Sequence, residues 1–162
     1  MRTLILSTAL GLATMGAAWA QGMTAQDFVN QAASGGLFEV QSSELALQKS
    51  QDANVQEFAK QMITDHTANN QELIATAQAE GLTVPTQISS PQAELMQTIQ
   101  GAEGDAFDTA YVQAQTTAHE TAVTLYQTYA QGGDNQALVA YAQKSLPALQ
   151  QHLEHVQGMA KK

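Results

Sequence analysis

Four long segments of this chain repeat apolar residues at helical spacing, and this pattern limits the fold more than any other feature. The segments cover residues 24–49, about 53–81, 105–130 and 134–158, and they are rich in Ala, Gln, Leu and Glu. These residue types favour helices, and the sequence holds no alternating run of β-branched residues long enough for a strand. The sequence therefore predicts an all-α protein built on four long helices.

The connections between the segments predict how these helices are arranged. A short turn at residues 50–52 and another at Gly132-Gly133 would make the flanking helices antiparallel neighbours. The middle connection, residues 82–105, holds two prolines, two glycines and a short helix opened by Ser90 and Pro91. This length favours a ferritin-like four-helix bundle, with one long crossover between parallel second and third helices, over an up-down-up-down bundle with short loops.

The N-terminal segment, residues 1–20, predicts export from the cytoplasm. One Arg, an apolar run and the ending Ala18-Trp19-Ala20 are typical of a signal peptide cleaved after Ala20. Gly, Ser and Thr interrupt the apolar run, which disfavours a membrane anchor. We therefore expect a signal peptide over residues 1–20, one helical bundle domain over 21–162, a periplasmic location, and no stable membrane insertion after cleavage.

Composition and missing motifs narrow the classes of function. The net charge is −9, and the single Arg lies in the predicted signal peptide, which argues against nucleic-acid binding and against docking on anionic lipid. The chain has no Cys, so disulfides, thiolate metal sites and cysteine nucleophiles are excluded. It has no Gly-rich phosphate loop, no H-E-x-x-H and no G-x-S-x-G motif. The sequence therefore gives no support for an enzyme.

Several polar residues fall on helix faces where apolar residues are expected. Burying an imidazole or a carboxylate alone is costly, so such residues usually pair or bind a ligand. Counting residues from the turns, at a rise of about 1.5 Å each, predicts two layers of candidate metal ligands. The first layer is Glu39, His66 and His119, and the second is Glu44, Asp108 and His152. Such mixed nitrogen and oxygen ligands suit Zn, Fe, Mn or Cu(II).

Other features of these residues leave a second interpretation open. A diiron site in a ferritin-like bundle needs Glu-x-x-His on two helices, but the residues three positions before these histidines are Ile63, Thr116 and Leu149. An oxidase is therefore not expected. The polar residues can instead form hydrogen-bonded layers that fix helix register without metal. A metal site would need neutral imidazoles, so its affinity should fall as the pH drops through about 6.5.

The chain also resembles a known family in several short elements. These are Glu39 and Glu44 in the first helix, the run from Phe58 to Asp65-His66, Phe107-Asp108-Thr109-Ala110-Tyr111 before His119, and Leu146-Pro147-Ala148-Leu149 before His152. In them the chain resembles the exported bacterial family called domain of unknown function 4142. The resemblance implies a ferritin-like bundle outside the cytoplasm and supplies no activity.

Two functions are expected from these observations. The first is a periplasmic bundle that binds a transition metal in envelope or stress physiology. The second is a metal-free structural bundle that contacts an envelope protein or a second copy of itself.

Overall fold

The computed structural model describes residues 22–160, and within that range the chain forms helices and no strand. The helices are α1 (Ala25–Lys49), α2 (Ala53–Ala79), α3 (Ser90–Gln100), α4 (Asp105–Gly132) and α5 (Gln136–Met159). The predicted signal peptide lies outside the described residues. Among residues 22–160, no helix combines the length and apolar character needed to cross a membrane.

Local signals in the sequence set the ends of most helices. Thr24 caps α1, because its side chain accepts a hydrogen bond from the backbone N–H of Asp27. Gly81 follows the end of α2 with a φ of +71°, a conformation that a glycine adopts without strain. The sequence favours Asp134 as the cap of the last helix, but Asn135 caps it, with its side chain accepting from the N–H of Leu138. Asp134 instead accepts a hydrogen bond from the Tyr129 hydroxyl.

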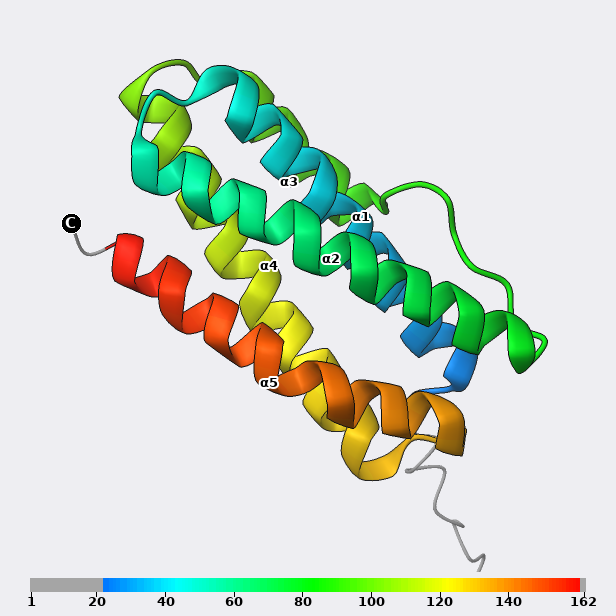
Figure 1. Ribbon diagram of the computed structural model, residues 1–162. Coiled ribbons are helices and arrows are strands. Elements are labelled where there is room, and N and C mark those ends of the chain that lie inside the picture. The colour runs from blue at the N-terminus through cyan, green and yellow to red at the C-terminus, as the bar shows by residue number, and fades with distance from the viewer. Residues whose placement is uncertain (1–21, 161–162) are drawn as a thin grey trace, which may run out of the picture.

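The four long helices form two antiparallel hairpins, α1 with α2 and α4 with α5, as Figure 1 shows. The hairpins pack together through α1 against α4 and α2 against α5. Helices α2 and α4 run in the same direction, so the predicted long crossover is confirmed. The chain reaches this arrangement because the segment after α2 returns along the bundle before α4 begins (Figure 1).

Helix α3 belongs to this crossover and packs against α1 and α4. Ser89 caps α3, one residue earlier than the sequence predicts. The Lys49 ammonium holds the other end, because it donates to the carbonyls of Gln100 and Ala102 and pairs with Glu103 at 2.7 Å. The end of the crossover is thereby fixed to the C-terminal end of α1, beside the α1–α2 turn.

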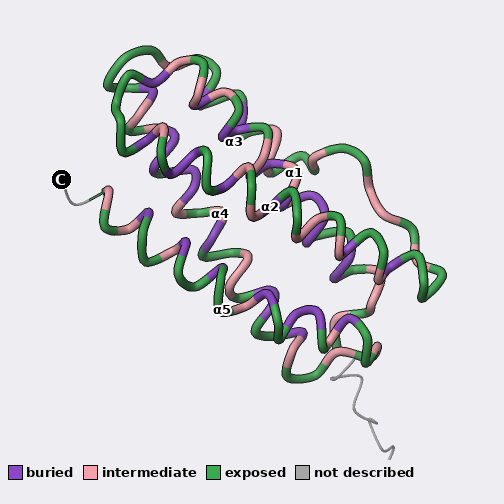
Figure 2. Tube along the Cα trace, in the orientation of Figure 1, coloured by how far each residue is buried: buried purple, intermediate pink, exposed green. Residues whose placement is uncertain are grey.

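The interior consists of two apolar clusters with polar residues between them. One cluster joins the N-terminal half of α1 to the hairpin turn of α4 and α5, where Phe28 stacks on Tyr129 at 4.2 Å between ring centroids. The other joins the C-terminal half of α1 to Phe58, Phe107 and Tyr111. Figure 2 shows the buried residues following the inward side of each long helix. The polar residues between the clusters are therefore surrounded by apolar packing above and below.

The Gly35-Gly36 pair does not break α1, which runs through it without interruption. A Cβ atom on Gly36 would overlap the Asn70 side chain, so this glycine permits α1 and α2 to approach closely. A Cβ on Gly35 would meet no described atom within 4 Å.

Candidate metal centre

Three histidines from three helices meet between the two apolar clusters. His66 of α2, His119 of α4 and His152 of α5 are 4%, 0% and 4% exposed. Their ring centroids lie 5.5 Å from one another in every pair. One potential ligand atom from each side chain lies within 4.8 Å of those from the other two. We call these three residues the histidine cluster.

Each ring of the histidine cluster has a buried nitrogen without a hydrogen-bond partner among the described residues. His119 Nδ1 lies 2.9 Å from the Gln115 carbonyl oxygen, which can only accept, so Nδ1 carries the proton. His152 Nε2 lies 2.9 Å from Asp65 Oδ2 and donates to it in the same way. Among the described residues, His66 Nε2, His119 Nε2 and His152 Nδ1 have no hydrogen-bond partner although they are buried. In His119 and His152 the unpartnered nitrogen is therefore the one that carries the lone pair.

The surroundings keep these imidazoles neutral. Burial, and then the neighbouring His119 and His152, lower the pKa of His66 well below its ordinary value. Burial lowers the pKa of His119 to about 4, against the opposing hydrogen bond to the Gln115 carbonyl. Burial also lowers the pKa of His152, although Asp65 opposes the shift. Neutral imidazole is the form that binds metal, so the cluster is ready for a cation at neutral pH.

The spacing also fits one ion. Nitrogen ligands about 2.0–2.1 Å from a tetrahedral metal lie about 3.3–3.4 Å from one another. The observed limit of 4.8 Å exceeds this by an amount that small side-chain rotations can remove. An unpaired buried polar atom is costly, and an unpaired nitrogen on each of three neighbouring histidines indicates a ligand.

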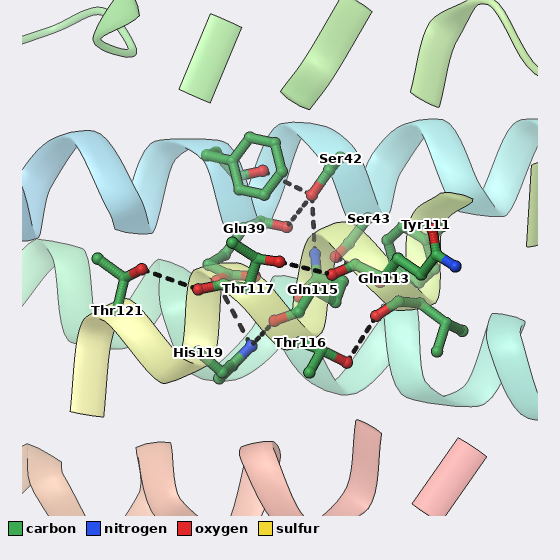
Figure 3. A network of polar contacts seen from close by, with 12 residues as sticks. Glu39, Ser42, Ser43, Tyr111, Gln113, Gln115, Thr116, Thr117, His119 and Thr121 are labelled. Carbon is green, nitrogen blue, oxygen red and sulfur yellow. Dashed lines mark hydrogen bonds and ion pairs between the residues drawn. The ribbon is translucent and has the colours of Figure 1, made fainter. Parts of the chain in front are cut away.

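Glu39 of α1 adjoins the cluster at His119. Its Oε1 lies 3.5 Å from His119 Nδ1, and its side chain is 3% exposed. Figure 3 shows the two side chains next to each other. Burial raises the pKa of Glu39 well above its ordinary value, although a hydrogen bond with the Gln115 side chain opposes this. Glu39 therefore contacts the nitrogen of His119 that faces Gln115, while its own Oε2 has no partner in the described part of the chain.

A buried hydrogen-bond network links Glu39 and His119 to the rest of α1 and α4 (Figure 3). Gln115 Nε2 donates to Ser42 Oγ at 2.8 Å, and Ser42 Oγ donates to the Phe38 carbonyl at 2.7 Å. The Ser43 and Tyr111 hydroxyls lie 2.9 Å apart. This network fixes the rotation of α1 against α4 and holds the Gln115 backbone that orients His119.

The structure corrects the predicted pair of layers. His152 joins His66 and His119, and it does not lie with Glu44 and Asp108. Counted from the turn that α4 and α5 share, His152 lies farther along its helix than His119 does. The difference is about 3 residues, or about 4.5 Å along the bundle, which helix tilt and side-chain reach can cover.

The other two predicted ligands lie apart from the histidine cluster. Glu44 is exposed and lines a hollow with Met96 and Gln100 beside α3. Asp108 is half-buried and lines a different hollow, near Asp52 at the start of α2. This arrangement therefore gives no support to Glu44 or Asp108 as a metal ligand.

Some residues of the site are not expected from the sequence. Asp65 is the hydrogen-bond partner of His152, and its position directly before His66 is a usable signal. Ser42 and Ser43 are fully buried. Serine occurs so often at surfaces that the sequence gives no sign of this burial. His155, which the helical pattern places on the solvent side, is exposed.

We expect Asp65→Asn to weaken metal binding by about 10–100-fold, because outer partners orient ligating histidines. The asparagine amide can turn its N–H₂ toward His152 Nε2, which would favour the tautomer with the proton on Nδ1. Isothermal titration with Cu(II) measures the change. Glu72→Gln is a suitable control, since Glu72 is a carboxylate on the same helix that pairs with Lys144 at 2.7 Å. Equal affinities of Asp65→Asn and wild type for Cu(II) would show that Asp65 does not contribute to metal binding.

Comparison with known proteins places this geometry among helical bundles. The sequence model of the family described as Domain of unknown function (DUF4142) matches residues 12–159. No curated protein matches the chain in sequence. A solved structure described as "CopM in the Cu(II)-bound form" is 14% identical, with a TM-score of 0.71 over 86% of this chain and 97% of that one. Another, "CopM in the Ag-bound form (by co-crystallization)", is 14% identical, with a TM-score of 0.67 over 84% and 94%. At this identity the likeness is one of fold.

Proposed function

This chain belongs to the DUF4142 family, and we propose that it is an exported protein which binds one transition-metal ion, with copper as the first candidate, through His66, His119 and His152. One observation carries the proposal. Three buried imidazoles with lowered pKa values each retain a nitrogen without a partner among residues 22–160, and their potential ligand atoms lie within 4.8 Å. Neutral imidazoles with free lone pairs, as in His119 and His152, bind a cation.

The ligand chemistry favours copper and zinc over the other metals expected from the sequence. Imidazole suits Zn, Cu, Fe and Ni, whereas Mn prefers oxygen ligands. Among divalent first-row ions, Cu²⁺ binds most tightly to a given nitrogen site. The fold neighbours named CopM are described as binding Cu(I), Cu(II) and Ag, which supports copper as the first metal to test.

A titration of the mature protein with Cu(II) tests the proposal. We expect one tightly bound ion per chain, with an electron paramagnetic resonance spectrum that shows coupling to imidazole nitrogens. Weak binding of several ions, or coordination by oxygen alone, would refute an internal site. The bundle would then stand as a metal-free structural protein whose buried histidines fix helix register. Elemental analysis of protein purified from its native compartment shows which metal it carries there.

The export part of the proposal has its own test. The small residues Ala18 and Ala20 fit the signal peptidase, so we expect the exported chain to begin at Gln21. Intact-mass measurement of protein from the periplasmic fraction checks this. A mass that retains residues 1–20 would refute export by cleavage and leave the metal site unaffected.

A further inference from the structure

A cavity of about 390 Å³ lies between α1 and α4, next to the start of α3, and reaches the histidine cluster. Most of its lining is apolar or small, including Gly35 of α1 and Ala118 and Ala122 of α4. His66 and Glu39 also line it. A cavity whose walls are largely apolar, with polar side chains among them, is typical of a small-molecule site.

Two of the polar side chains that line this cavity, His66 and Glu39, have buried atoms without a hydrogen-bond partner. His66 is 4% exposed and its Nε2 has no partner, while Glu39 is 2% exposed and its Oε2 has none, counting the described residues. Both side chains are thus deeply buried and both line the same space. The unpartnered atoms are evidence separate from the cavity's volume. They indicate that a polar group occupies the cavity beside them.

The coordination of the proposed metal is incomplete without a further ligand. The histidine cluster supplies three nitrogens, whereas Zn and Cu sites usually hold four or more ligands. Two carboxylates adjoin the cluster, but each contacts an outward nitrogen. Asp65 bonds to His152 Nε2, and Glu39 lies at His119 Nδ1. In this arrangement neither carboxylate is placed to supply the fourth ligand.

Charge indicates what kind of ligand is missing. Three neutral imidazoles bring no negative charge, so the charge of a divalent ion between two apolar clusters would be opposed only from a distance, by the Asp65 carboxylate behind His152. A small anion on the metal would halve that charge. The cavity is large enough for such an ion, since one water molecule takes about 30 Å³ of liquid.

The opposite face of the site is less suited to this ligand. A groove between α2 and α5 is lined by Asp65 and His152. It meets His152 at the Nε2–Asp65 hydrogen bond, so it adjoins the nitrogen that does not face the cluster. The cavity between α1 and α4 is instead lined by His66, whose Nε2 has no hydrogen-bond partner among the described residues.

We propose that the cavity between α1 and α4 holds a small monoanion, a few atoms in size, that binds the metal as its fourth ligand. This inference rests on the proposed function. The metal site is then open to exogenous ligands from one side and closed on the other. Such a site can exchange its anion without releasing the metal.

Azide is the probe, because it is a small anion and gives a charge-transfer band when it binds Cu(II). Two variants narrow the cavity from opposite walls, Gly35→Leu in α1 and Ala122→Leu in α4. A side chain at Gly35 starts in open space, since a Cβ there meets no described atom within 4 Å. Gly158→Leu in α5 is the matched control, because a Cβ there is equally free and Gly158 does not line the cavity. Ala148→Leu narrows the groove between α2 and α5.

We expect azide to bind the copper-loaded wild type and to bind Gly35→Leu and Ala122→Leu about tenfold more weakly, a difference of about 1.4 kcal/mol. Copper affinity should stay unchanged in all four variants, and azide affinity should stay unchanged in Gly158→Leu and Ala148→Leu. Copper-loaded wild type without an azide band would refute the open site. Azide affinity that falls only in Ala148→Leu would place the ligand in the groove and overturn the proposal. Failure of wild type to bind copper would instead refute the proposed function itself.

Discussion

His66→Ala is expected to abolish tight binding of Cu(II) and Zn. The variant removes one of three converging nitrogens and leaves a gap at the centre of the cluster, so the remaining two imidazoles no longer enclose an ion. At a free metal concentration of about 100 times Kd, binding should stabilise wild type by about 2.7 kcal/mol, and the variant should gain nothing. Thermal melts with and without metal measure this as a rise in Tm of about 8 °C for wild type alone.

His155→Ala is the matched control for this experiment. His155 lies three residues after His152 on the same helix and is exposed, so its loss removes a surface imidazole and spares the cluster. It should keep the full metal-induced rise in Tm. Equal rises in His66→Ala and wild type would show that the metal binds elsewhere and would leave the structural interpretation standing.

The metal-free form of a second variant shows how much the buried imidazole of His66 destabilises the fold. His66→Leu replaces an imidazole whose Nε2 has no partner in the described chain with an apolar side chain of similar bulk. We therefore expect apoprotein His66→Leu to be at least as stable as wild type while it loses metal binding. Stability gained together with binding lost is typical of a residue kept for function.

The apoprotein is expected to lose stability as the pH falls below about 6.5, the ordinary pKa of a histidine in the unfolded chain. The folded chain holds the pKa of His119 near 4 and lowers those of His66 and His152. Between about pH 4 and pH 6.5 the histidines of the unfolded chain bind protons that those of the folded chain do not. The stability that these histidines contribute is therefore full above about pH 6.5 and falls as the pH approaches 4, with His119 alone accounting for about 3 kcal/mol.

Glu39 changes the stability of the apoprotein with pH in the direction opposite to the histidines. Its raised pKa in the fold means that the folded carboxyl keeps a proton that the unfolded carboxyl loses above about 4.5. The stability it contributes is therefore present at low pH and lost as the pH rises. Three histidines with lowered pKa values outweigh one such carboxyl below 6.5, so the net slope still favours higher pH.

Urea unfolding of the apoprotein from pH 4 to 8, with a chelator present, measures this profile. His119→Leu should show a shallower loss on the acid side, because one of the three proton-binding groups is gone. Stability that is constant between pH 4 and 6.5, or that rises toward acid, would contradict burial of neutral histidines. The lowered pKa values also correct the sequence-based expectation for metal affinity, which should persist below pH 6.5.

The sequence by itself determined the helices and their connectivity. Helical periodicity, the capping residue Thr24 and Gly81 with its positive φ mark α1 and α2 within a residue or two. The long connection with Pro85 and Pro91 is enough to predict the crossover and the parallel second and third helices. Polar residues on otherwise apolar faces, above all His66 and His119, mark the interior site. These signals are local, since each depends on residues within a few turns of one helix.

Tertiary structure alone decided which polar residues meet. Residue counting assigns His152 to a second layer with Glu44 and Asp108, yet it lies beside His66 and His119, because the level of a residue across the bundle depends on the tilt and offset of a neighbouring helix. Counting residues from a turn ignores both of these. The pairing of Asp65 with His152, and the cavity left between α1 and α4, depend on the rotation of each helix about its own axis. Those rotations are set by contacts between helices distant in sequence, which no local pattern records.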